Sequence, residues 1–267
     1  MTINNFVFLQ KKMTYQTIRL ISDFNIRIIE LDYPEKLNSQ SQVFFDEFDD
    51  AIELIHNDAD AKVLIIRGLV SVFSAGGNLK EIAAADYEKS YLMCLRVQNS
   101  FRSLHNLNIP VIAALSGIVY GGGFELALHC DIRFASENTD LRLPEAELGL
   151  IPGAGGTSLL SKIISPADAA YYLYSGNSIP IDVAKSKGLI QAVYKSDELY
   201  SKTLEFAKNI SLKSTQSLAA IKKIQVASLY KDLNSTYNLE AREFSSVLQT
   251  SGKTGIRAFF DKKNKIK

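Results

Sequence analysis

The chain has 267 residues, enough for one large domain or two small ones, and its 30 basic residues are almost balanced by 29 acidic ones. The resulting net charge of +1 excludes the strongly basic surface that is typical of nucleic-acid binding or of attachment to an anionic membrane. No apolar stretch is long enough to cross a bilayer. We therefore expect a globular protein with neither nucleic acid nor membrane as a partner.

Residues 1–12 are interpreted as an N-terminal extension, with Met13 as an alternative start. Their positive charges follow a short apolar run, and no small-residue cleavage site comes next, which is the wrong order for a signal peptide. Cys94 and Cys130 lie in apolar, helix-like surroundings and are expected to be buried free thiols, as in a reducing compartment. Three histidines without ligand spacing predict no metal site. Together these features indicate a cytoplasmic protein.

Short β-like runs alternate with helical ones over the first two thirds of the chain. Apolar runs rich in Val and Ile predict strands at 26–31, 62–67, 110–116 and 132–135. Helical spacing predicts helices over 39–55 and over 78–105, the second interrupted near Asp86. After Ala154 helical periodicity continues to the end, apart from one strand within 189–194. This pattern indicates an α/β core followed by a helical C-terminal part.

Two glycine clusters, at 121–123 and 153–156, stand where helices are expected to begin. Neither matches a dinucleotide-binding loop, because Leu126 replaces the third required glycine in the first cluster and the second cluster also lacks it. Neither carries the Gly-Lys-Ser/Thr of a P-loop. The nucleophile-elbow pattern is absent around Ser116, because Ala114 occupies its first position. The glycines therefore indicate neither nucleotide binding nor serine-hydrolase chemistry.

Bare backbone before a helix forms a site for an oxyanion, and the first cluster adds a lone carboxylate, Glu125, in the first turn of a nearly all-apolar run. A carboxylate in a low-dielectric environment is a candidate proton shuttle. The alternative is structural: glycines commonly form turns, and the helix dipole favours a Glu in the first turn. Upstream, Asn78 is expected to cap a helix, with Glu81 at the third helical position. This leaves Gly77 in the same kind of bare-backbone position as Gly122, with a plain loop-to-helix junction as the alternative.

A third segment, at 144–157, holds two acids in an otherwise apolar run. The spacing of Glu145 and Glu147 does not decide which of them points inward. A pair of solvated carboxylates is the usual arrangement for such residues.

In order along the chain, three segments resemble those of the enoyl-CoA hydratase/isomerase (crotonase) superfamily: FSAGGNLKE at 73–81, GGGFELALHCD at 121–131 and PEAELGLIPGAGGT at 144–157. The resemblance begins near Tyr15 and reaches the segment GIRAFFDKK at 255–263. It implies an α/β fold, a crotonase-like spiral of repeated ββα units over 13–197. A helical C-terminal region over 198–267 is expected to build trimers, often paired into hexamers, within the same folding unit.

The resemblance also implies acyl-CoA or acyl-carrier-protein thioester substrates and no metal or redox cofactor. The backbone N–H groups of Gly77 and Gly122 would form an oxyanion hole for the thioester oxygen, and the family's two catalytic glutamates fall on Glu125 and Glu145. By the same resemblance, Glu125 mainly activates water and Glu145 transfers the proton at Cα. Gly153 would supply a backbone partner for the second carboxylate or for the water. We therefore expect a lyase that adds water to, or removes it from, a 2-enoyl thioester.

Some residues depart from the family pattern and bear on substrate choice. Asn78 replaces the usual Asp, and Arg142 and Leu143 stand where short-chain hydratases often have Gly-Gln. Tyr120 stands where Leu is common and is expected to narrow the acyl pocket, with Ala75 and Leu143 also contacting the substrate. The alternatives are a double-bond isomerase, a specialised acyl-thioester dehydratase or thioesterase, and a non-catalytic scaffold or nucleic-acid binder. Retention of both glutamates favours the hydratase.

Overall fold

The computed structural model describes residues 15–69 and 71–264, so the extension predicted over residues 1–12 lies outside the described residues. Its strands form a six-stranded sheet, in the order β1-β2-β3-β5-β7-β9, and a three-stranded sheet, in the order β4-β6-β8. The large sheet consists of β1 (Ile18–Asp23), β2 (Ile26–Leu31), β3 (Val63–Arg67), β5 (Val111–Leu115), β7 (Ile132–Ser136) and β9 (Ala192–Tyr194). The small sheet consists of β4 (Val72–Ser74), β6 (Ile118–Tyr120) and β8 (Asp140–Arg142).

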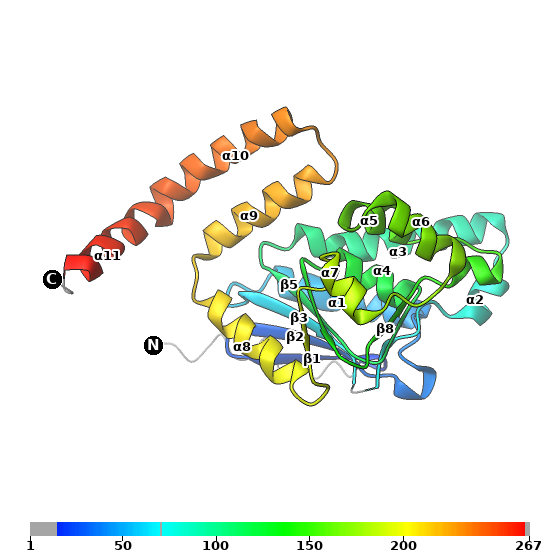
Figure 1. Ribbon diagram of the computed structural model, residues 1–267. Coiled ribbons are helices and arrows are strands. Elements are labelled where there is room, and N and C mark those ends of the chain that lie inside the picture. Colours follow the sequence, from blue (N-terminus) through cyan, green and yellow to red (C-terminus); the bar gives the residue numbers. More distant parts are fainter. Residues whose placement is uncertain (1–14, 70, 265–267) are drawn as a thin grey trace.

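Helices lie on both faces of the large sheet (Figure 1). Those before the last strand are α1 (Gln42–His56), α2 (Leu79–Ala83), α3 (Tyr87–Asn106), α4 (Gly122–His129), α5 (Gly156–Ile163), α6 (Pro166–Ser175) and α7 (Ile181–Ser186). Those after it are α8 (Leu199–Ser211), α9 (Thr215–Ser228), α10 (Leu233–Val247) and α11 (Lys253–Asn264), the last two joined by a π-helical turn, η4 (Leu248–Gly252). Two short 3₁₀ helices are η2 (Pro34–Lys36) and η3 (Glu145–Leu148).

The chain alternates between the two sheets. β1 and β2 form an antiparallel pair, and the later strands pair in parallel within their own sheet. The chain passes through β3 and β4 before α2 and α3, and repeats this path with β5, β6 and α4 and with β7, β8 and α5. Parallel strands require such crossover connections. The repeat is a spiral of ββα units, which is the fold class predicted from the sequence.

The large sheet is buried on both faces. All residues of β2 and β5 are buried, as are all but the last residue of β3. On one face lies the main core, to which α1 contributes Phe48 and α3 contributes Phe101. On the other face, α8 packs Ala207 into a second cluster that includes Ile65 of β3. Burial on both faces explains why these strands are continuous apolar runs without alternating polar residues.

The helices after α8 extend away from the sheets. Figure 1 shows α10 and α11 standing off the body of the molecule, with α9 between them and the sheets. Lys222 fixes α9 to the body, because its Nζ donates to the Ile109 carbonyl (3.0 Å) and lies 2.9 Å from the Asp131 carboxylate. The exposed large apolar side chains on α10 and α11 are Leu233, Tyr237, Phe244, Ile256, Phe259 and Phe260. In the part of the chain that the structure describes, no helix has both the length and the apolar character of a membrane span.

The predicted elements are present with shifted ends. The predicted strands correspond to β2, β3, β5, β7 and β9. Helix α1 begins at Gln42, not at residue 39, because Ser41 accepts a capping bond from the Phe44 N–H (3.4 Å). The long helical stretch is divided at Asp86, which caps α3 through the Lys89 N–H (2.9 Å). Strand β1 and the three short strands of the small sheet were not predicted from the sequence.

Candidate active site

Helix α4 begins at a bend that favours glycine. Gly121 has a φ of +50°, and Gly122 opens the helix. The first intrahelical bond runs from the Glu125 N–H to the Gly121 carbonyl (2.9 Å), so the N–H of Gly122 lies ahead of the helical hydrogen-bond pattern. Near the other end of α4, the buried guanidinium of Arg133 donates to the Ala127 carbonyl (3.2 Å). The helix is thus fixed at its C-terminal end and presents bare backbone at its N-terminal end.

The loop before α2 lies directly against this helix start. A Cβ on Gly76 would be 2.8 Å from the Gly122 nitrogen, and a Cβ on Gly122 would be 3.4 Å from the Gly77 nitrogen. Gln40 forms a parallel bridge with Gly77, donating its N–H to the Gly76 carbonyl (2.8 Å) and accepting from the Asn78 N–H (3.0 Å). Because N–H groups alternate in direction along an extended segment, the Gly77 N–H points away from this bridge. The two glycines predicted to form an oxyanion hole are therefore neighbours in space.

Glu125 is the buried acid in the first turn of α4, with 4 % of the residue exposed. Its Oε1 accepts hydrogen bonds from the N–H groups of Ala154 (2.7 Å) and Gly156 (2.9 Å). Gly156 opens α5, so the positive end of that helix faces the carboxylate. Burial raises the pKa of Glu125 to about 7, against the effect of the two backbone hydrogen bonds and with a further contribution from the charge of Glu145. At neutral pH, both protonation states are therefore accessible.

Glu145 is the second carboxylate next to the start of α4. Its Oε1 would be 3.1 Å from a Cβ on Gly121. Burial raises its pKa, and among the residues that the structure describes its Oε2 is buried without a hydrogen-bond partner. Glu147, in contrast, is exposed and accepts a hydrogen bond from the Arg142 guanidinium (2.7 Å). Of these two acids, Glu145 is the one that faces the helix start.

The nitrogens of Gly77 and Gly122 and the carboxylate of Glu145 thus lie at the start of α4, whose first turn carries Glu125. Backbone N–H donors near acid–base groups are suited to stabilising an oxyanion while protons are transferred. The family model described as enoyl-CoA hydratase/isomerase matches residues 23–266. The chain belongs to the enoyl-CoA hydratase/isomerase family. It is therefore an enzyme of the crotonase superfamily, as predicted from the three segments.

Relatives of this family member are similar over nearly their whole length. A protein of Arabidopsis thaliana named probable enoyl-CoA hydratase 2, mitochondrial, is 33 % identical over 92 % of this chain and 82 % of its own. A probable enoyl-CoA hydratase of Rhizobium meliloti is 31 % identical over 94 % of this chain and 97 % of its own. The crystal structure of an enoyl-CoA hydratase from Bacillus anthracis has a TM-score of 0.88 at 31 % identity, covering 92 % of this chain and 97 % of that one. These relatives support hydratase-like activity for the family member described here.

The residues predicted to contact the substrate lie around this site in different environments. Ala75 is half-buried and directly precedes the glycines of the loop before α2. Tyr120 ends β6, donates its hydroxyl to Asp140, and has its ring 5.5 Å from the guanidinium carbon of Arg142. Leu143 is buried in the main hydrophobic core. Contact of these side chains with a substrate remains a prediction.

The third glycine-rich segment holds the buried carboxylate through residues that sequence reasoning missed. Gly153, the predicted backbone partner of the second carboxylate or of the water, accepts a hydrogen bond at its carbonyl from Gln98 (2.8 Å). The donors to Glu125 are Ala154 and Gly156, one and three residues farther along. Backbone donors have no side-chain signature. The available signal was the pair of glycines at 155–156 before a helix, which is the pattern of an anion-accepting helix start.

Cys94 is exposed, so the prediction that it is a buried thiol was wrong. It lies in the N-terminal half of α3, where Leu95 is exposed as well, because this helix buries side chains such as Phe101 only toward its C-terminal end. Cys130 is buried and free, as predicted, and burial raises the pKa of its thiol to about 12. Within residues 15–69 and 71–264, no three His, Cys, Asp or Glu side chains are grouped as a metal ion would require.

Proposed function

We propose that this family member is a hydratase that adds water across the double bond of a 2-enoyl thioester, or removes it in the reverse direction. One observation carries the proposal. Glu125 is buried in the first turn of α4, and the Glu145 carboxylate lies at the start of the same helix, where the nitrogens of Gly77 and Gly122 are neighbours. Two acid–base groups and an anion site would thus act on one reacting unit.

In the proposed reaction, the N–H groups of Gly77 and Gly122 donate to the thioester oxygen while it gains negative charge. The water oxygen bonds to Cβ, its proton passes to Glu125, and the π electrons of the double bond move onto the thioester oxygen. Glu145 then gives a proton to Cα as the enolate returns to the carbonyl. Donors fixed by the backbone stabilise this charge without having to reorganise during the reaction.

The hydrogen bonds and pKa values of the two carboxylates support this division of roles. One oxygen of Glu125 is held by the N–H groups of Ala154 and Gly156, which leaves its other oxygen to bind the water. A pKa of about 7 lets Glu125 take up and release a proton at neutral pH. Burial raises the pKa of Glu145 and so favours the protonated form that a proton donor to Cα needs.

The proposed substrate is an acyl-CoA thioester, in keeping with the family, and an acyl-carrier-protein thioester would present the same reacting group. CoA is part of the substrate, and the proposed steps use no metal or redox group. Contacts of Ala75, Tyr120 and Leu143 with the acyl group belong to the same proposal. A cytoplasmic location is also proposed, although relatives from Arabidopsis thaliana and Dictyostelium discoideum carry names that include mitochondrial.

We further propose that α9, α10 and α11 form the contacts of a homotrimer, or of a hexamer made from two trimers. The six large apolar side chains exposed on α10 and α11 support this proposal, because exposed apolar side chains gathered on neighbouring helices often mark a protein interface. Helix α8 packs on the large sheet. In this proposal α8 belongs with the α/β core, which the sequence predicts over 13–197. The proposed assembly surface then includes only the helices after α8, and not the whole C-terminal region predicted over 198–267.

Loss of enoyl-thioester absorbance on mixing with crotonyl-CoA tests the activity. Glu125→Gln and Glu145→Gln should each lower kcat by about 10²- to 10⁴-fold, because each removes an acid–base group. Glu147→Gln is the matched control, since this exposed carboxylate pairs with Arg142 outside the proposed site. If the protein isomerises a 3-enoyl-CoA but hydrates no 2-enoyl-CoA of any chain length, the isomerase alternative replaces the hydratase. Full activity of Glu125→Gln would rule out the two-carboxylate mechanism.

A further inference from the structure

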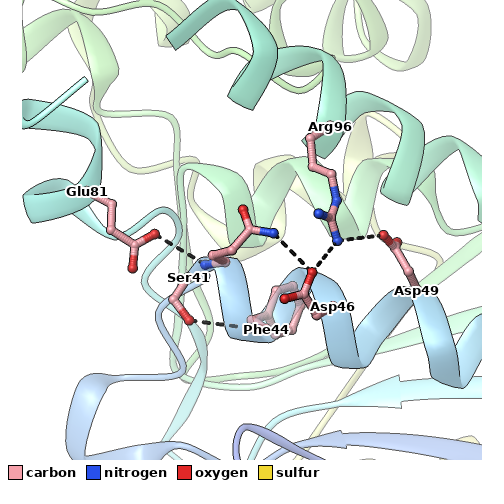
Figure 2. A network of polar contacts seen from close by, with 7 residues as sticks. Ser41, Phe44, Asp46, Asp49, Glu81 and Arg96 are labelled. Atoms are coloured by element: carbon pink, nitrogen blue, oxygen red, sulfur yellow. Dashed lines mark hydrogen bonds and ion pairs between the residues drawn. The ribbon is translucent and has the colours of Figure 1, made fainter. Parts of the chain in front are cut away.

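Gln40 is fixed to the same backbone segment as Gly77. Its N–H and carbonyl bond to the residues on either side of that glycine, as described above. Figure 2 shows how the chain is held directly after Gln40: Ser41 accepts from the Phe44 N–H, and Glu81 of α2 accepts from the backbone N–H of Gln42 (3.2 Å). The backbone that carries the Gln40 side chain is therefore held in place relative to Gly77.

The side-chain amide of Gln40 lies at the two nitrogens of the proposed oxyanion hole. A Cβ on Gly122 would overlap Gln40 Oε1 and would be 3.4 Å from both Gln40 Cδ and the Gly77 nitrogen. The residue is 4 % exposed, and within the described part of the chain its buried Nε2 has no hydrogen-bond partner. A buried N–H donor without an acceptor destabilises a fold, so this amide is expected to acquire an acceptor from elsewhere.

Asn38, two residues earlier, shows what a purely structural amide does in the same segment. It is equally buried, with 4 % exposed. Its Nδ2 donates to the carbonyls of Val72 (3.2 Å) and Phe73 (3.0 Å), and its Oδ1 accepts from the Tyr33 N–H (2.7 Å). Both ends of its amide are therefore hydrogen-bonded to the backbone. The contrast separates Gln40 from a residue that serves only the packing of this loop.

We propose that Gln40 is a catalytic residue, a side-chain donor that joins the N–H groups of Gly77 and Gly122 on the thioester oxygen. The proposal rests on the proposed function, which places that oxygen at the two glycines. In the structure, the carbonyl end of the amide faces the helix start. Rotation about the last side-chain torsion, which is soft and nearly two-fold, exchanges the carbonyl and NH₂ ends in place. The bound oxygen then receives three donors, and the added bond strengthens as the oxygen becomes an enolate.

Gln40→Met keeps the length of the side chain and removes the donor. With crotonyl-CoA it should lower kcat by about 10- to 100-fold and leave KM nearly unchanged, because the missing bond forms mainly in the transition state. Gln40→Glu keeps the shape, but only its protonated form can donate. Its activity relative to the unaltered protein should therefore recover as pH falls. Gln42→Met is the matched control, since the Gln42 side chain is exposed and donates to Asp46 (3.0 Å), and it should keep full activity.

Three results would overturn the role of Gln40. A kcat of Gln40→Met within about twofold of the unaltered protein means that no donor was lost, and a higher kcat means that the amide only obstructs the hole. Equal losses in both Gln40 variants, with a lowered Tm and no recovery at low pH, mean a structural role. These outcomes are distinct from failure of the proposed function. If the unaltered protein hydrates crotonyl-CoA and Glu125→Gln does not, the hydratase stands whatever Gln40 does, whereas absence of any thioester activity removes both proposals.

Discussion

Glu125→Gln should make the protein more stable at high pH while it removes the proposed catalytic base. The folded-state pKa of Glu125 is about 7, whereas its ordinary value is 4.5. Between these two values, the folded protein keeps a proton that the unfolded chain has released. The stability of the unaltered protein therefore falls as pH rises through this window, and the loss is complete above about pH 7.

The magnitude follows from the difference between the two pKa values. About 2.5 units at 1.36 kcal/mol each gives about 3 kcal/mol, and the near-complete burial of Glu125 leaves little room for solvent screening. Glutamine keeps an oxygen that can accept from the N–H groups of Ala154 and Gly156, without the charge. We expect Glu125→Gln to raise the free energy of unfolding by about 3 kcal/mol near pH 8.5 and by almost nothing near pH 4.5. For a chain of this size, that corresponds to roughly 6–12 °C in Tm.

Urea and thermal unfolding at both pH values, at one fixed protein concentration, measure this effect. Glu147→Gln is the control: it removes an exposed ion pair with Arg142 and should change stability by less than about 1 kcal/mol at either pH. The reasoning fails if the effect of Glu125→Gln is the same at both pH values, or if the variant is less stable at the higher one. Either result would mean that ionisation of Glu125 does not destabilise the folded protein.

Gly122→Ala places a methyl group over Gln40 Oε1, the movable end of a side chain, so the fold should tolerate it. Because the methyl group crowds the thioester oxygen at the two N–H donors, kcat/KM should fall about 10²- to 10³-fold, as for the loss of one donor. Loss of crotonyl-CoA absorbance measures this change, and an unaltered kcat/KM would contradict it. The kcat/KM of the unaltered enzyme should fall as pH decreases through about 7, because Glu125 must be ionised to accept the proton of water, and a flat profile would contradict this role. Phe244→Asp should lower the mass measured by light scattering, because it puts a charge into the proposed subunit contact; an unchanged mass would place the contact elsewhere.

The length of an element and the range of its contacts decide how much of this fold can be predicted from the sequence. Helices α1 and α3 have 15 and 20 residues, enough for helical periodicity to be recognised, and β2, β3 and β5 are continuous apolar runs. The strands β4, β6 and β8 have three residues each, too few to show any period. They form because parallel pairing joins segments that are far apart in the sequence.

The residues of the candidate site also differ in whether a local sequence signal or a distant contact identifies them. Gly77 and Gly122 could be recognised because bare backbone before a helix is a local signal. Gln40 could not be recognised, because its position at the site depends on a bridge to Gly77, which lies 37 residues later in the chain. The spacing of Glu145 and Glu147 did not decide between them, because the contact that distinguishes Glu145 is with Gly121, 24 positions earlier in the chain.

Glu125 combines a local signal with a distant one. A single carboxylate in an apolar helix predicts burial, and burial by itself favours the neutral acid, which cannot accept a proton from water. The N–H groups of Ala154 and Gly156, 29 and 31 residues downstream, favour the ionised form and bring the pKa back to about 7. The proposed base therefore depends on the docking of α5 against α4 as much as on its own helix. A substitution that displaced the start of α5 would raise the pKa of Glu125 further and stop it from acting as a base, without changing any atom of the carboxylate.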